Sequence, residues 1–180
     1  MATVDIDPAG DVIVEIGEEL ERVRVSSKTM SLTSPVFRAM FNSGFREGLT
    51  AQTSSSNPST ISLPDDDLAA FLYLGKIMHF QKPELPPEAD IEFLEKVTGM
   101  YDKYQFTTPI AHIVEAPLDQ FIRSAAMTDL YRILFIAYLL DAPQLFSTTS
   151  WEILITHPIS FESMPAMMEH PSISTTLRGE

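Results

Sequence analysis

The stretch Ser34-Pro-Val-Phe-Arg-Ala-Met-Phe41 constrains the fold more than any other part of the chain. Ser34 is a good N-cap, because a serine hydroxyl accepts a hydrogen bond from a free amide of the first helical turn. Pro35 follows at the first helical position, where a missing N–H is tolerated. Phe37, Met40 and Phe41 recur at helical spacing and form one apolar face. We therefore predict a short amphipathic helix here.

A β-hairpin is predicted before this helix and a lone strand after it. Residues 11–16 and 20–25 are rich in β-branched residues and flank a Gly-Glu-Glu turn, a pattern typical of paired strands. Residues 60–63 are too few to be stable alone, so we expect them to join the hairpin. Residues 1–10 are expected to be a tail. The fold class is therefore α+β, with a small three-stranded sheet capped by short helices.

The rest of the chain is expected to be mainly helical. Asp65-Asp66-Asp67 is expected to open a helix, because negative charge stabilises a helix N-terminus. Apolar periodicity predicts helices over about 90–103, 117–126, 130–140 and 143–155, with Trp151 as a large anchor in the last. Residues 157–180, with three prolines and three methionines, are expected to form a marginal helix and a tail.

Charge and cysteine content exclude several classes of function. The chain has 12 Lys and Arg against 25 Asp and Glu, and the basic residues are scattered. Nucleic acids and anionic membranes need clustered cations, so neither is expected as a partner. The absence of cysteine excludes disulfides, Cys-ligated zinc and thiol catalysis. The acidic N-terminus does not have the pattern of a signal peptide, and a cytoplasmic or nuclear protein is expected.

The order of these elements, with these residues in it, resembles the BTB/POZ domain. The residues that carry the resemblance are Asp11-Val12, Val25-Ser-Ser-Lys-Thr-Met30, Ser34–Phe41, Ser43-Gly-Phe-Arg-Glu47, Ile61-Ser-Leu-Pro-Asp-Asp-Asp67 with Phe71, Leu94-Glu-Lys-Val97 and Tyr101-Asp-Lys-Tyr-Gln-Phe106. Val-Ser-Ser-Lys and His79 are similar to the single-domain fungal branch of that family. The resemblance implies a BTB/POZ domain over 11–106 and a helical extension over 107–156.

One departure from the family pattern concerns a charged groove. Transcription-factor members pair a basic residue after the second strand with the aspartate that corresponds to Asp11, but Ser27 stands at the basic position here. Lys28 is the candidate to replace it. Family dimers exchange an N-terminal segment, and only ten residues precede Asp11, so a monomer or weak homodimer is expected.

The resemblance implies a non-catalytic protein–protein interaction module. Phe45-Arg46-Glu47 resembles the hydrophobic-x-Glu motif by which cullin-recruiting members bind their cullin, and an exposed aromatic beside a carboxylate suits a binding hot spot. The expected protein-binding residues are Phe41, Phe45, Arg46, Glu47, Asp11 and Lys28. The partner is a cullin of a ubiquitin ligase or another BTB protomer, and the alternative of a self-associating transcriptional scaffold without cullin binding stays open.

No cofactor, metal or catalytic residue is expected. The four histidines are far apart in sequence and lack metal-ligand spacing; they are His79, His112, His157 and His170. Asp65–Asp67 need no metal to explain them, because negative charge stabilises the N-terminus of the helix that follows. A hydrolase is the competing hypothesis. It would require two of the histidines, or a histidine and the aspartate run, to approach each other in space.

Overall fold

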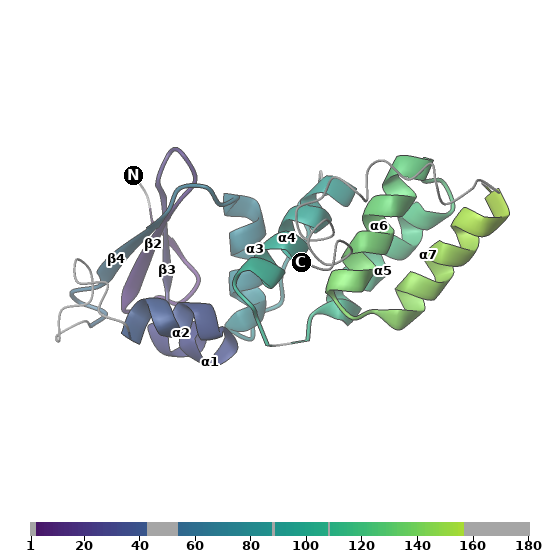
Figure 1. Cartoon of the computed structure of the whole chain (residues 1–180). Coiled ribbons are helices and arrows are strands. Elements are labelled where there is room, and N and C mark those ends of the chain that lie inside the picture. Colours follow the sequence, from purple (N-terminus) through teal and green to yellow (C-terminus); the bar gives the residue numbers. More distant parts are fainter. Residues whose placement is uncertain (1–2, 43–53, 88, 108, 157–180) are drawn as a thin grey trace, which may run out of the picture. The chain divides into compact units, whose positions relative to one another are not determined.

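The computed structural model describes residues 3–42, 54–87, 89–107 and 109–156 (Figure 1). These residues form a mixed α and β fold with four strands and seven helices, so the expected α+β class is confirmed. The strands are β1 (Thr3–Asp5), β2 (Val12–Ile16), β3 (Glu21–Val25) and β4 (Ser59–Leu63). The helices are α1 (Ser27–Thr33), α2 (Pro35–Asn42), α3 (Leu68–Met78), α4 (Ile91–Lys103), α5 (Ala111–Ile122), α6 (Met127–Leu139) and α7 (Pro143–Thr156).

The four strands form one sheet in the order β1-β3-β2-β4. The predicted hairpin is the antiparallel pair β2–β3, and the lone strand β4 joins it by pairing in parallel with β2. Gly17 begins the hairpin turn with a φ of +71°, a conformation that glycine adopts without strain. Both predictions about these strands are confirmed.

The sheet has a fourth strand, and the expectation of three strands was wrong. β1 lies within residues 1–10, expected to be a tail, and pairs in parallel with β3. Three residues carry no periodic signal, so nothing local distinguishes this strand from a tail. Its position depends instead on the β3 edge and on Ile6, which follows it and is 2% exposed.

The chain divides into two compact units. The first holds the described residues up to Ala89 together with those from Lys96 to 107, and the second holds Asp90–Glu95 and the described residues from Pro109 onward. α4 therefore contributes its first turn to the second unit and the remainder to the first. In the first unit, α1 contacts α2 and α3, and α3 contacts β3.

Phe37 of α2 lies at the centre of an aromatic cluster in the first unit. Its ring stacks on Tyr104 with a centroid distance of 4.6 Å and lies 5.9 Å from Phe106 and 6.5 Å from Phe71. The Ser34 hydroxyl accepts from the amide of Phe37 at 3.0 Å, which confirms the predicted cap. The same hydroxyl donates to the carbonyl of Tyr104 at 2.5 Å.

The second unit is a helical cluster in which α5, α6 and α7 contact one another. α5 begins at Ala111 and contains Pro117, so the predicted start at 117 was wrong. Val114, Leu118 and Ile122 recur every four residues and are all at most 3% exposed. Their packing outweighs the backbone hydrogen bond that Pro117 cannot donate. None of the helices in the described ranges is long and apolar enough to cross a membrane.

Candidate functional site

The Asp11 carboxylate binds Ser27, the residue that replaces the expected basic partner. Oδ1 accepts from the Ser27 amide at 2.8 Å, and Oδ2 accepts from the Ser27 hydroxyl at 2.6 Å. Both carboxylate oxygens are thus engaged by one residue at the start of α1. The hydrogen bonds found for the Asp11 carboxylate therefore come from Ser27, and the hypothesis that Lys28 pairs with Asp11 stays a prediction.

Of the other predicted protein-binding residues on α2 and in the segment after it, the structure describes Phe41. Phe41 is 8% exposed, and its ring lies 5.8 Å from that of Phe37, so it contributes to the core more than to a surface. Phe45, Arg46 and Glu47 lie outside the described residues.

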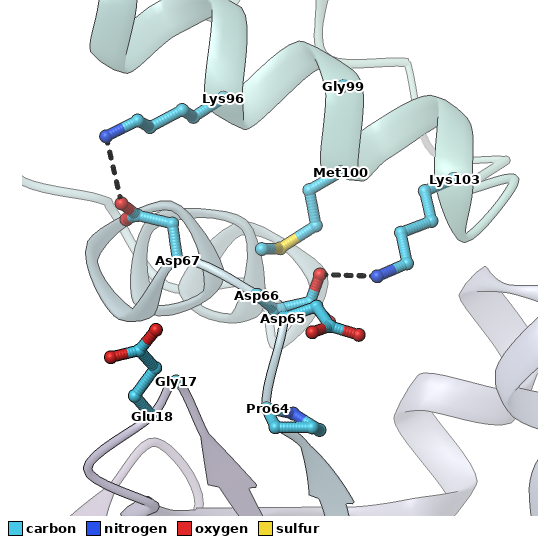
Figure 2. Close-up of a pocket in the computed structure, with 10 residues that line it drawn as sticks. All are labelled: Gly17, Glu18, Pro64, Asp65, Asp66, Asp67, Lys96, Gly99, Met100 and Lys103. Atoms are coloured by element: carbon cyan, nitrogen blue, oxygen red, sulfur yellow. Dashed lines mark hydrogen bonds and ion pairs between the residues drawn. The ribbon is translucent and has the colours of Figure 1, made fainter.

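A pocket of about 690 Å³ in the first unit is lined by six charged side chains (Figure 2). The hairpin turn contributes Gly17 and Glu18, and the connection from β4 to α3 contributes Pro64–Asp67. The wall that faces them is the later part of α4. Its lining residues, Lys96, Gly99, Met100 and Lys103, recur at helical spacing and therefore share one face.

Two ion pairs cross the pocket between the connection and α4 (Figure 2). Lys96 Nζ lies 3.3 Å from Asp67 Oδ2, and Lys103 Nζ lies 2.7 Å from Asp66 Oδ1. The second carboxylate oxygen of Asp66 accepts from the Tyr104 hydroxyl. Asp66 is 9% exposed, and its burial is compensated because both of its oxygens are bound.

Asp67 has a separate role as the N-cap of α3. Its Oδ1 accepts from the amide of Ala70 at 3.0 Å. Burial by itself would raise the pKa of the Asp67 carboxyl, but the Ala70 amide and the Lys96 ammonium outweigh it and hold the pKa below its ordinary value. The expectation that the aspartate run opens a helix is confirmed for this residue.

Tyr104 is kept protonated by the same surroundings. Burial, and after it the hydrogen bond to Asp66 and the charges of Asp66 and Asp65, raise the pKa of the Tyr104 hydroxyl well above its ordinary value. A neutral hydroxyl is a donor, as the bond to Asp66 requires.

The pocket is suited to binding charge rather than to covalent chemistry. Four carboxylates and two ammonium groups line it, so it carries an excess of negative charge, and its lining residues include no histidine, cysteine, serine or threonine. Among the described residues, Glu18 and Asp65 are the lining carboxylates for which we find no hydrogen bond or ion pair. A nucleophile with an adjacent base is not assembled by these residues.

Neither His79 nor His112 is among the residues that line the pocket with the aspartate run. His79 at the end of α3 binds Ser26 and Gly75, and His112 is an exposed residue of α5. Within the described residues, no group of three or more His, Cys, Asp or Glu side chains could hold a metal ion. His157 and His170 lie outside the described residues.

The sequence interpretation assigned only a capping role to the aspartates and missed the lysines that bind them. The signal was present, because Lys96 and Lys103 are seven residues apart and hence on one face of a predicted helix. The sequence alone does not show that this face of α4 packs against the aspartates.

No protein-family model matches the chain, and a search of curated proteins finds no match either.

Proposed function

We propose that this chain is a non-catalytic protein–protein interaction module of the BTB/POZ type. The observation that carries the proposal is the link between Ser34 and Tyr104. These residues belong to two sequence blocks on which the resemblance rests, Ser34–Phe41 and Tyr101–Phe106. The hydrogen bond between them at 2.5 Å and the stacking of Phe37 on Tyr104 place both blocks in one core.

Within that class, we propose an adaptor for a cullin-based ubiquitin ligase that binds through Phe45, Arg46 and Glu47. Asp11 is bound by the uncharged Ser27. This favours the adaptor role over a transcriptional scaffold, because the charged groove of the transcription-factor members pairs that aspartate with a basic residue. β1 pairs with β3 of its own chain, which supports a monomer or weak homodimer.

The pocket supports a binding function over the competing hydrolase. Its two lysines, Lys96 and Lys103, are held in ion pairs with Asp67 and Asp66. No described histidine lines the pocket. A hydrolase of the Ser-His-Asp type would need a hydroxyl nucleophile beside a histidine base, and the lining residues include neither.

The test is a binding titration of the purified full chain against a recombinant cullin of the class that recruits BTB proteins. Replacing both Phe45→Ala and Glu47→Ala should weaken binding by about tenfold or more, because hot-spot residues dominate interface energies. The double variant Phe80→Ala and Glu84→Ala is the matched control, since it removes the same two residue types at exposed positions after α3.

The control should bind as tightly as the parent, and circular dichroism should show that all three proteins are folded. Absence of binding by the folded parent would refute the cullin adaptor. Equal binding by the parent and the Phe45/Glu47 variant would show that the motif is not the contact.

A further inference from the structure

β4 forms one edge of the sheet and lacks the features by which proteins usually protect such an edge. It pairs with β2 on its inner side, and no other strand of the described residues lies beyond it (Figure 1). Edge strands are normally blocked by charged residues, prolines or bulges. The β4 sequence Ser-Thr-Ile-Ser-Leu contains no charged residue and no proline, and its register with β2 is unbroken. The opposite edge, β1, is three residues long and carries Asp5 in an ion pair with Arg24.

The hydrogen bonds at the two ends of β4 show which of its backbone groups point outward. The amide of Ser59 donates to the carbonyl of Asp11 at 3.0 Å, and the carbonyl of Leu63 accepts from the amide of Gly17 at 3.1 Å. Successive residues of a strand direct their backbone groups alternately to the two sides. The N–H and C=O groups of Thr60 and Ser62 therefore point away from β2, where we find no partner for them among the described residues.

We propose that β4 pairs with β4 of a second copy of the chain, antiparallel and about a two-fold axis at Ile61. This axis places Thr60 opposite Ser62 of the second copy, and Ser62 opposite its Thr60. Because both residues direct an N–H and a C=O outward, the two pairs would form four hydrogen bonds between the copies. The edge is thus complementary to itself, as a two-fold dimer requires.

The side chains suit the same pairing. Thr60 and Ser62 are exposed and would lie opposite each other on one face of the joined sheet, where pairs of hydroxyl residues are favourable. Ile61 is half-buried and would contact Ile61 of the second copy on the other face, with the two Cα atoms about 4.5 Å apart.

A weak dimer is expected, because the shared edge is short and each copy carries a formal charge of −13. Salt screens such repulsion and should strengthen the association. The proposal rests on the weak homodimer of the proposed function and involves no cullin, so its tests can fail while the cullin titration succeeds.

Cysteine cross-linking tests the register, since the chain has no native cysteine. In the full-length Ile61→Cys variant the two cysteines would lie opposite each other at a separation that a disulfide spans. Mild oxidation should therefore give mainly a disulfide-linked dimer. Thr60→Cys is the matched control, because this position is more exposed but would lie opposite Ser62, and it should form several-fold less dimer. Equal or faster cross-linking of Thr60→Cys, or no dimer from Ile61→Cys, would overturn the proposal.

Sedimentation velocity over a range of protein and salt concentrations measures the association itself. Thr60→Pro removes an outward amide without removing a hydrogen bond to β2, so it should raise the Kd of the dimer about tenfold or more. Thr3→Pro is the matched control at the other edge; its amide also points outward, because Ile6 donates to Arg24. The control should associate like the parent, with circular dichroism showing that all three proteins are folded. A parent that stays monomeric at every concentration and salt, or a Kd that Thr60→Pro leaves unchanged, would refute the pairing.

The exposed apolar face of α7 is the competing surface for self-association. Trp151, Leu154 and Ile155 are 64%, 57% and 59% exposed, so the expectation that Trp151 is an anchor of the core was wrong for the described residues. These side chains specify neither a register nor a partner, whereas the outward groups of β4 specify both. Trp151→Ala should therefore leave the Kd of the dimer unchanged. A dimer that is weakened by Trp151→Ala and not by Thr60→Pro would assign self-association to α7 and overturn the proposal.

Discussion

The backbone amide of Ser26 donates to Nε2 of His79 at 3.0 Å, and this bond joins the start of α1 to the end of α3. Because an amide is always a donor, Nε2 must be unprotonated, and Nδ1 carries the proton. Nδ1 accordingly donates to the carbonyl of Gly75 at 2.7 Å. The neutral imidazole is thus the form that the fold requires.

This arrangement predicts that stability falls on mild acidification. Burial lowers the pKa of His79, and the Gly75 carbonyl and the charge of Asp7 offset burial only in part. The unfolded chain therefore binds the proton more readily than the folded chain. The contribution of His79 is complete above the unfolded pKa of about 6.5 and is lost as the pH falls through the lower folded pKa.

Urea unfolding at pH values on either side of that window measures the effect. His79→Gln cannot titrate, so it should remove the part of the pH dependence that lies between the two pKa values. His112→Gln is the matched control, since His112 is exposed, and it should unfold with the pH dependence of the parent. The prediction is wrong if the two variants have the same pH profile.

Ser34→Ala should destabilise the first unit by about 1–3 kcal/mol. Ser34 is 0% exposed, and the substitution removes the acceptor of the Phe37 amide and the donor to the Tyr104 carbonyl together. Ser31→Ala in α1 removes a hydroxyl for which no such bond is found, and it should change the free energy of unfolding by less than about 0.5 kcal/mol. Chemical denaturation of both variants checks the difference, and equal values would contradict it.

Two glycines should respond to alanine in opposite directions. A Cβ at Gly99 in α4 would meet no atom within 4 Å, so Gly99→Ala should raise the free energy of unfolding by roughly 0.5–1 kcal/mol through helix propensity. A Cβ at Gly10 would lie 2.4 Å from the Val25 carbonyl oxygen. The backbone of β3 cannot move aside without loss of pairing, so Gly10→Ala should cost about 1–3 kcal/mol. Thermal melts of the two variants should shift in opposite directions, and a shift of the same sign would refute this reading.

Much of the first unit follows from local rules. Ser34 caps α2, Asp67 caps α3, and the β-branched residues on either side of the Gly-Glu-Glu turn favour a hairpin. Each of these features depends on residues a few positions apart. The same rules locate β4 and the later helices. They fail at α5, where burial of Val114, Leu118 and Ile122 carries the helix through Pro117.

The sequence alone therefore determined the α+β class, the hairpin and the helix caps of this protein. Tertiary structure decided that Thr3–Asp5 is a strand, that Ser27 binds Asp11, and that Lys96 and Lys103 bind the aspartates across a pocket. It also decided which face of α7 is left exposed. The physical reason is sequence distance: these partners are roughly 15 to 40 residues apart, and their meeting depends on the path of the whole chain rather than on local preference.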